Sequence, residues 1–553
     1  MLRLNILWGI LFVFAQTLQS QTPVYDTGGP LLPEQAAYDV TFYDLALNIL
    51  PDQHAINGQL TVTAHIVQPI NALLLNLDTL LKVSAVEYRT DQGAWIAAPF
   101  SHRNGYLNIE LPYTRQPGQN VAARVSYGGK PRPAPMAPWN GGFSWSRTQS
   151  GAYWIATTCQ SEGADVWWPC KDHVSDKPDS MALHITVPKP LVVATNGRLQ
   201  GIDANADNTS TYHWFVSTPI SAYNIALNIA PYRLIEGSLK SVAGDEYPVV
   251  FYVLPEDYEK GQALFPQILD HLRFYEKWLG PYPFRADKYG VAQTPHLGME
   301  HQTIIAYGAR FDNSSMTRRD WGFDALHHHE LAHEWWGNLV TNSDWRDMWI
   351  HEGFGSYMQA MYMEQLRGKE GYFEYIKSMR RFPNNRAIAP REATTGDEIY
   401  KAPIYTKGAW VLHMLRFLMG DEAFFQSLRR MAYPDPAMEA VTDGRQTRFV
   451  NTDDFLHICE QQSGLQLDDF FEVYLRQAAL PKLYSRVEED HISLRWEAPD
   501  GRPFTLPVEL EIKGKKQRVT VTSQGISVPL PKNAKPVVDP DGWLAFDIVG
   551  MEK

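Results

Sequence analysis

Apolar and polar residues alternate with a period of two through the first part of the chain, from Tyr38 to about Ile235. The clearest runs are residues 43–49 and 60–66, where every second side chain is apolar. This alternation is typical of strands that bury one face and expose the other. Turn pairs such as Asn-Gly and Gly-Gly recur between the runs. Residues 21–235 are therefore predicted to form an N-terminal β domain, either a sandwich or a saddle-shaped sheet.

The apolar residues take up helical spacing in the central part of the chain. They recur every three or four positions from residue 264 to residue 279, and Gly280 followed by Pro281 predicts the end of that helix. The same spacing is found in residues 325–336, 353–366, 407–418, 422–431 and 452–462. Residues 236–480 are therefore predicted to form a mostly helical domain.

Alternation returns after Pro481, in residues 508–512 and 519–521. About seventy residues suffice for two small packed sheets, so residues 481–553 are predicted to form a C-terminal β-sandwich. The predicted fold class is multidomain α+β, in the order β domain, mostly helical domain, β-sandwich.

Length and charge narrow the function classes. A chain of 553 residues is too long for one hydrophobic core, which agrees with several folding units. The formal net charge is -12, and no cluster of Lys and Arg is present. Binding to nucleic acid or to an anionic membrane needs a concentrated basic face, so neither partner is expected.

The first twenty residues have the pattern of a secretory signal peptide. Arg3 gives a positive start, residues 6–15 are almost wholly apolar, and residues 16–20 are polar and end in a small side chain. An apolar run of about ten residues is too short to cross a bilayer, so no stable membrane span is expected. We expect residues 1–20 to be cleaved and the protein to be secreted or periplasmic.

Cysteines are few for a chain in an oxidising compartment. Only Cys159, Cys170 and Cys459 are present, so a disulfide framework is not expected. A bridge between Cys159 and Cys170 and a pair of buried thiols both remain open.

A metal-binding pattern lies in the segment 323–336, which has no Pro or Gly. His329 and His333 are four residues apart, so both imidazoles point from one face of the predicted helix toward one ion. Glu330 is turned about 100° away along the helix, which suits a general base that reaches the bound water. Catalytic zinc commonly takes a third, carboxylate ligand and keeps one position open, and Glu352 can supply it. One Zn²⁺ per chain is predicted.

Two observations bear on how specific this pattern is. A surface helix with solvated histidines is the alternative, but the apolar neighbours Trp335 and Trp336 favour a half-buried helix. His327 and His328 also precede the motif, but neither has a histidine four residues further on, so they are not expected to be ligands.

The wider neighbourhood resembles a known family. The segment HELAHEWWGNLVT and the later segment WRDMWIHEGFGSYM are similar to the gluzincin aminopeptidases of the M1 type, the group that includes aminopeptidase N and leukotriene A4 hydrolase. The resemblance implies a thermolysin-like catalytic domain, the zinc ligands His329, His333 and Glu352, and the base Glu330. It also implies that the helical C-terminal domain of familiar members is missing here, which would leave a more open cleft.

Three further motifs resemble the same family. The first is a segment similar to the family's substrate-binding strand, and it consists of Leu297, Gly298, Met299, Glu300 and His301. The resemblance implies that Glu300 binds the free α-amine of a substrate. His301 stands where the family usually has Asn, and its ring can still donate a hydrogen bond to the substrate backbone. The resemblance also implies that Tyr405, in a Tyr-x-Lys-Gly element, stabilises the oxyanion of the tetrahedral intermediate formed during peptide hydrolysis. It also implies that Gln160 is a second ligand of the amine.

Together these residues predict a secreted zinc aminopeptidase that acts on peptides with a free N-terminus. A thermolysin-like endopeptidase shares the zinc ligands but lacks an amine anchor, and it is the main alternative. Epoxide hydrolysis on a lipid is a second alternative that no residue here demands. A peptide-binding protein with a dead site would need a lost ligand or base, and none is lost. The sequence does not predict the oligomeric state or the preferred N-terminal residue.

Overall fold

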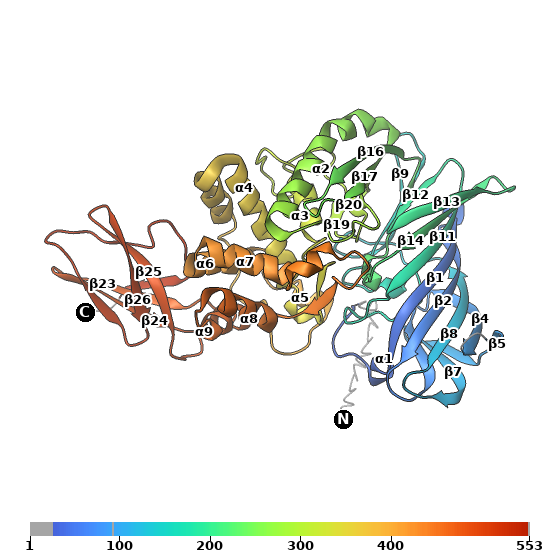
Figure 1. Ribbon diagram of the computed structural model, residues 1–553, viewed down its shortest axis with the longest axis horizontal. Helices are drawn as coiled ribbons and strands as arrows, with labels where there is room; N and C mark the ends of the chain where they lie inside the picture. Colours follow the sequence, from blue (N-terminus) through green and yellow to red (C-terminus); the bar gives the residue numbers. More distant parts are fainter. Residues whose placement is uncertain (1–25, 91–92, 551–553) are drawn as a thin grey trace, which may run out of the picture.

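The structure, a computed structural model, describes residues 26–90 and 93–550. The predicted signal peptide lies outside the described residues. The molecule is elongated, with the N-terminal strands at one end, the helices in the middle and the last strands at the other end (Figure 1). The order of the three parts therefore follows the order predicted along the chain.

The N-terminal part is built on an eight-stranded sheet. Its strands lie in the order β13 (Arg198–Ala204), β14 (Thr209–Val216), β11 (Ser180–Pro188), β1 (Tyr38–Leu50), β2 (Ala55–Ile66), β8 (Asn120–Gly129), β4 (Leu81–Thr90) and β5 (Ile96–Ala97). β1 pairs in parallel with β11 and antiparallel with β2. On β1, Leu45, Leu47 and Ile49 are buried as the period-two pattern requires.

Two smaller sheets and a short helix complete this part. One sheet has the order β3 (Ile70–Asn76), β7 (Tyr106–Arg115) and β6 (Phe100–Arg103), and the other has the order β12 (Val192–Thr195), β15 (Leu227–Ala230), β10 (Tyr153–Thr158) and β9 (Gly142–Arg147). The helix is α1 (Pro33–Ala36). The β character predicted from the alternation is confirmed.

The central part contains the predicted helices and also a sheet that the sequence analysis missed. The helices are α2 (Tyr258–Leu279), α3 (Ala325–Ala332), α4 (Trp349–Ser378), α5 (Gly396–Ile399), α6 (Thr406–Met419), α7 (Asp421–Ala432), α8 (Thr452–Ser463) and α9 (Asp468–Phe471). The five-stranded sheet has the order β16 (Arg233–Lys240), β17 (Glu246–Val253), β18 (Tyr289–Gln293), β20 (Ile305–Tyr307) and β19 (Gly298–Met299). A small parallel pair joins β21 (Val340–Asn342) to β22 (Arg448–Val450). Three of the missed strands, β18, β20 and β19, are short buried runs, which periodicity alone does not distinguish from buried helix.

Two small sheets form the C-terminal part. One has the order β27 (Ile526–Pro529), β24 (His491–Glu497), β23 (Lys482–Val487) and β29 (Asp547–Gly550), and the other has the order β26 (Lys515–Thr522), β25 (Thr505–Ile512) and β28 (Val537–Val538). Alternate side chains of β24 and β25, among them Trp496 and Leu510, are buried in the core.

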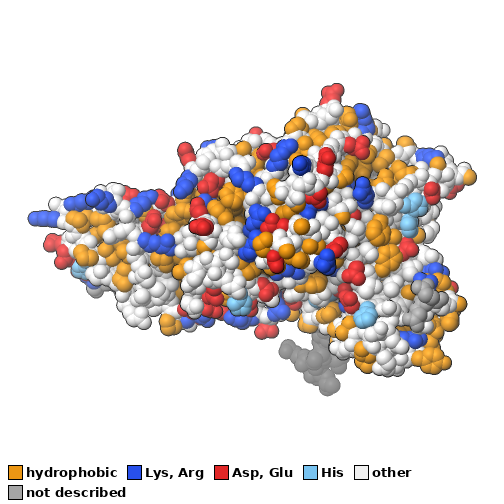
Figure 2. All heavy atoms as spheres, in the orientation of Figure 1, with side chains coloured by type: hydrophobic (Ala, Val, Ile, Leu, Met, Phe, Trp, Pro, Cys, Tyr) orange, Lys and Arg blue, Asp and Glu red, His pale blue; other side chains and the backbone are white. Residues whose placement is uncertain are grey.

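Three features of the described residues bear on the composition-based expectations. No helix within residues 26–90 and 93–550 is long and apolar enough to cross a membrane. In Figure 2, basic and acidic side chains are interspersed over the middle of the molecule on the face shown. Cys159, Cys170 and Cys459 are all buried free thiols, so the structure forms no bridge between the first two.

Candidate metal centre and active site

The two predicted histidine ligands and the predicted carboxylate meet at one point inside the central part. His329 lies on α3, and His333 follows the last residue of that helix. The Nε2 atoms of the two rings are 3.2 Å apart. The Oε2 atom of Glu352, from the first turn of α4, lies 3.2 Å from Nε2 of His329 and 3.5 Å from Nε2 of His333. All three side chains are at most 3% exposed.

The chemistry of this group fits a divalent ion with nitrogen and oxygen ligands. Two imidazoles and one carboxylate are a common set for catalytic zinc. Nδ1 of His333 lies 3.0 Å from the carbonyl oxygen of Trp336, which assigns the proton to Nδ1 and leaves Nε2 free to bind an ion. Burial lowers the pKa of His333 to about 4, so the ring is neutral. Burial alone would raise the pKa of Glu352, but the His333 and His329 rings bring it down to about 2.

The other two histidines of the triple run face away from this group. Nδ1 of His327 lies 2.8 Å from Nδ1 of His271, and its Nε2 lies 2.9 Å from the hydroxyl of Tyr289. His328 is also fully buried, and its Nδ1 lies 3.0 Å from the hydroxyl of Tyr275. The prediction that His327 and His328 are not ligands agrees with these contacts.

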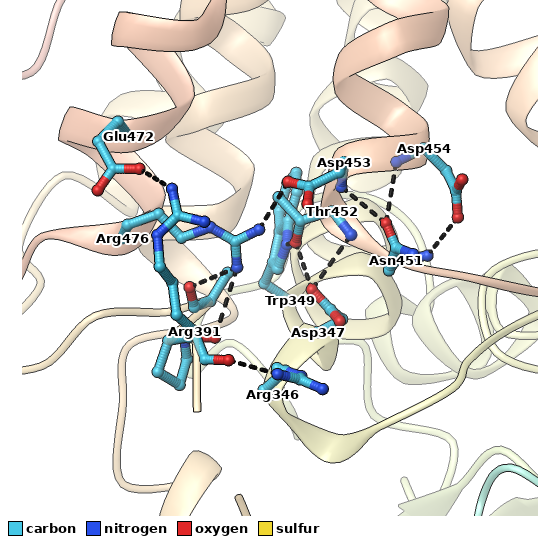
Figure 3. Close-up of polar contacts among 12 residues, drawn as sticks. Arg346, Asp347, Trp349, Arg391, Asn451, Thr452, Asp453, Asp454, Glu472 and Arg476 are labelled. Atoms are coloured by element: carbon cyan, nitrogen blue, oxygen red, sulfur yellow. Dashed lines mark hydrogen bonds and ion pairs between the residues drawn. The ribbon is translucent and has the colours of Figure 1, made fainter. Parts of the chain in front are cut away.

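The helix that carries Glu352 is fixed at its start by a polar network (Figure 3). A carboxylate oxygen of Asp347, just before α4, accepts hydrogen bonds from the backbone N–H and the hydroxyl of Thr452, at 3.1 and 2.5 Å. The indole N–H of Trp349 donates to the same hydroxyl at 2.8 Å. Thr452 is the first residue of α8, whose N-terminus is capped by Asn451. The first turn of α4 is therefore held against the start of α8, which limits the positions open to Glu352.

Tyr405 reaches the metal-binding group because two helices approach closely. It lies directly before α6, and its ring centroid is 5.9 Å from that of His329. A Cβ atom on Gly353 of α4 would lie 2.8 Å from the Cα of Gly408 on α6, which is too close. Only glycine at both positions allows α4 and α6 to pack at this separation.

A cavity of about 510 Å³ opens above the group. Ten of the predicted site residues line it: Gln160, Leu297, Gly298, Met299, Glu300, His329, Glu330, His333, Glu352 and Tyr405. β19 and α3 pack closely in the wall of the cavity, because a Cβ on Gly298 would lie 2.4 Å from Oε1 of Glu330. The strand residues and the zinc-binding helix are therefore in direct contact.

Carboxylates gather at the inner end of the cavity. Nε2 of Gln160 donates to Oε1 of Glu300, and the hydroxyl of Tyr223 lies 3.4 Å from the same oxygen. Burial raises the pKa of Glu300 to about 8, and the charge of Glu352 adds to this shift. The pKa of Glu330 is raised well above its usual value, mainly by burial and to a lesser extent by the charges of Glu300 and Glu352. A cation entering the cavity would favour the charged forms of these carboxylates.

Comparison with known proteins agrees with this geometry. The family model described as the Peptidase M1 N-terminal domain matches residues 40–224, and the model described as the Peptidase family M1 domain matches residues 266–474. The chain belongs to peptidase family M1. The second match includes α3, α4 and α6, so it contains the whole metal-binding group and Tyr405.

Relatives of this M1 chain include named aminopeptidases. It is 29% identical over 310 residues to aminopeptidase N of Lactococcus lactis subsp. lactis, a match that covers 47% of the chain and 35% of the relative. It is 23% identical over 506 residues to the puromycin-sensitive aminopeptidase of Caenorhabditis elegans, covering 85% of the chain and 51% of the relative. The chain thus spans about half the length of these relatives or less.

The fold is also that of solved M1 structures. A mutant M1 zinc metallopeptidase from Deinococcus radiodurans, bound to a Tyr-Ser-Ala substrate, superposes with a TM-score of 0.64 at 24% identity, and the match covers 82% of this chain and 96% of that one. A two-domain M1 zinc metallopeptidase mutant bound to L-tryptophan gives a TM-score of 0.63 at 24% identity, with the same coverage.

One residue of the predicted substrate-binding strand, His301, does not reach the cavity with its side chain. His301 is fully buried and does not line the cavity. Neither of its ring nitrogens has a hydrogen-bond partner among the described residues. The strand β19 ends at Met299, so the chain direction beyond Glu300 is set by the following turn and not by alternation. The structure thus places the His301 ring outside the cavity lining, and its donation to a substrate backbone stays a prediction.

Several residues of the M1 cavity were missed by sequence reasoning. The hydroxyl of Tyr400, the residue after α5, donates to Oε1 of Glu352 at 2.8 Å. Trp139 lines the cavity although it is 61% exposed. Met316, Asp397 and Lys401 also line it. An exposed tryptophan is a weak signal in sequence, and the role of Tyr400 depends on a contact that no local pattern shows.

Proposed function

We propose that this protein is a secreted zinc aminopeptidase that removes the first residue from peptides. The observation that carries the proposal is the pair formed by Glu300 and Gln160 beside the metal-binding group. A carboxylate at this place suits the free α-ammonium of a peptide, which an endopeptidase has no reason to bind.

The residues that would hold the ion are His329, His333 and Glu352. When bound, zinc lowers the pKa of a coordinated water toward neutrality and polarises a carbonyl group. The remaining chemistry is assigned to side chains of the chain itself.

Glu330 is the general base in this proposal. It lines the cavity next to the metal-binding group and is 7% exposed. Its carboxylate would accept a proton from the attacking water and pass it to the leaving amine, and burial, which raises its pKa above the usual value, favours the first of these transfers.

Tyr405 is the donor to the oxyanion. The pKa of its phenol is raised well above the usual value, mainly by burial and to a lesser extent by the charges of Glu352 and Glu300. The phenol therefore keeps its proton. A protonated phenol held against the cavity can donate a hydrogen bond to the negative oxygen of a tetrahedral intermediate.

The short distances among Glu300, Glu330 and His333 support cleavage at the first bond. Single ligand atoms of Glu300, Glu330 and His333 all lie within 4.8 Å of one another. The α-nitrogen and the carbonyl carbon of one amino acid are about 2.5 Å apart. An ammonium bound by Glu300 therefore brings the first carbonyl to the base, whereas a second residue between them would not fit.

The test compares amino-acyl fluorogenic reporters with their N-acetylated forms on the zinc-loaded protein. We expect cleavage of the free-amine reporters only, and Glu300→Gln should raise KM for them. The control is Tyr113→Phe, at a side chain that is 75% exposed and lies on β7 of the N-terminal part. Equal cleavage of both reporter series would make the protein an endopeptidase and would sink the proposal.

Secretion and the C-terminal sandwich belong to the same proposal. The signal-peptide pattern of residues 1–20 supports export, and N-terminal sequencing of the exported protein should find a start near Gln21. The two small sheets of residues 482–550 would pack face to face as the predicted β-sandwich.

A further inference from the structure

Two histidines face each other on the eight-stranded sheet of the N-terminal part. His184 of β11 and His213 of β14 are direct partners in the antiparallel pairing. Their Nδ1 atoms are 2.7 Å apart, and their ring centroids are 4.9 Å apart at an interplanar angle of 61°. The Nδ1 atoms of the two rings therefore point at one common position.

A carboxylate lies behind each ring. Nε2 of His184 is 3.3 Å from an oxygen of Asp44 on β1, and Nε2 of His213 is 3.0 Å from an oxygen of Asp203 on β13. The four side chains form a row across four neighbouring strands, β1, β11, β14 and β13. The histidine side chains are 34% and 29% exposed, so the row is open to solvent. Figure 2 shows histidine atoms at the surface where these strands lie in Figure 1.

The protonation of the two rings decides what lies between their Nδ1 atoms. Nε2 of His213 donates its proton to the Asp203 carboxylate, whereas Nε2 of His184 faces Asp44 at 3.3 Å without a hydrogen bond. A neutral imidazole has one N–H, so Nδ1 of His213 is a bare acceptor. Without a metal, Nδ1 of His184 carries its proton and donates to that acceptor at 2.7 Å; a metal ion that displaces this proton would be bound by both Nδ1 atoms.

We propose that His184 and His213 bind a divalent first-row transition metal, Cu²⁺ before the others, through their two Nδ1 atoms. This site is separate from the one formed by His329, His333 and Glu352. Asp44 and Asp203 orient the rings, as carboxylates behind metal-binding histidines commonly do. Water completes the coordination on the open side.

The spacing of the nitrogens favours copper over zinc. Metal–imidazole bonds of about 2.0 Å at about 90°, the arrangement of a square-planar ion, separate two nitrogens by about 2.8 Å. Tetrahedral zinc would require about 3.3 Å. The observed 2.7 Å thus matches neighbouring positions of a tetragonal Cu²⁺, which is also the ion that nitrogen ligands bind most tightly in the divalent series.

The experiment uses the full-length, tag-free protein with its catalytic metal already loaded. Cu²⁺ is added in a calorimetric titration, and the product is examined by electron paramagnetic resonance. We expect one Cu²⁺ in addition to the loaded ion, with a spectrum that shows two nitrogen ligands. His184→Gln and His213→Gln should each lose at least tenfold in copper affinity, and Asp203→Asn should lose ~10- to 100-fold.

The matched control is His65→Gln. His65 lies on β2 of the same sheet, and its Nδ1 is 3.0 Å from the side-chain oxygen of Asn120 instead of a second histidine. This variant should bind copper like the wild type. The proposal is overturned if the wild type binds no copper beyond the loaded site, if its spectrum shows a single nitrogen ligand, or if His184→Gln and His65→Gln bind copper equally. The spectrum of the wild type decides the matter even if a variant does not fold.

Discussion

Removal of one hydroxyl, in Tyr400→Phe, should weaken metal binding without touching a metal ligand. Oε1 of Glu352 accepts a hydrogen bond from Tyr400 at 2.8 Å, while Oε2 faces the two histidine nitrogens. The hydroxyl thus fixes which oxygen is presented to the ion. In the variant, the carboxylate can rotate, and a buried charged oxygen loses its donor.

The size of the effect follows from the kind of bond that is lost. A hydrogen bond to a charged group contributes roughly 1.5–3 kcal/mol, and loss of an outer partner of a metal ligand typically costs ~10- to 100-fold in affinity. The two figures agree, since ~10- to 100-fold corresponds to about 1.4–2.7 kcal/mol. We therefore expect the dissociation constant for zinc to rise by ~10- to 100-fold in Tyr400→Phe.

Competition with a chromophoric chelator, starting from the metal-free protein, measures this constant directly. Tyr223→Phe is the matched control, because its hydroxyl lies 3.4 Å from Glu300 instead of Glu352. It should change KM for amino-acyl reporters and leave zinc affinity as it is. An unchanged zinc affinity in Tyr400→Phe, or an equal loss in both variants, would refute the reasoning.

Three further predictions concern catalysis, specificity and stability. Glu330→Gln should lower kcat by at least ~10²-fold with full zinc content by atomic absorption, and a purified variant that keeps its activity would refute the assigned base. Trp139→Ala removes an apolar wall of the cavity, so kcat/KM for bulky apolar reporters should fall several-fold relative to an alanyl reporter; a uniform loss would argue against a side-chain contact. Burial lowers the pKa of Lys407 to about 8, whereas an unfolded lysine titrates near about 10.4, so the unfolded chain binds more protons between these values. Urea unfolding should therefore show the wild type gaining stability relative to Lys407→Met as pH rises from 8 toward 10, and parallel pH curves would contradict this.

The parts of the site that the sequence predicted depend on local geometry. The spacing of His329 and His333 fixes their common face once the segment is helical, and no distant contact is needed to see it. The strand residues before Glu300 were found through their resemblance to a family motif. In contrast, Tyr400 acts on a carboxylate 48 positions away in sequence, and nothing local marks that contact. The burial of the His301 ring outside the cavity lining also has no local signal, because the short strand β19 ends before this residue.

The fold was predicted to a similar depth. Long runs with a clear period predicted the β character of the N-terminal part and the helix α2, which ends at Leu279 just before the predicted stop at Gly280. The five-stranded sheet was missed because three of its strands, β18, β20 and β19, are two to five residues long and buried along their whole length. Buried strands of this length have no alternation, so only their pairing with distant neighbours identifies them.

The triple histidine shows why a metal site needs more than its ligands. His327, His328 and His329 are identical in chemistry and adjacent in sequence, yet only the last joins His333. Successive helical residues turn by about 100°, so the three rings enter three different surroundings. The first two are buried on faces where the structure supplies hydroxyl or imidazole partners, and an unpaired imidazole there would cost about 1–3 kcal/mol. Those partners hold α3 at one rotation about its axis. The same rotation aims His329 at Glu352, so the buried neighbours contribute to the geometry of a site that they do not touch.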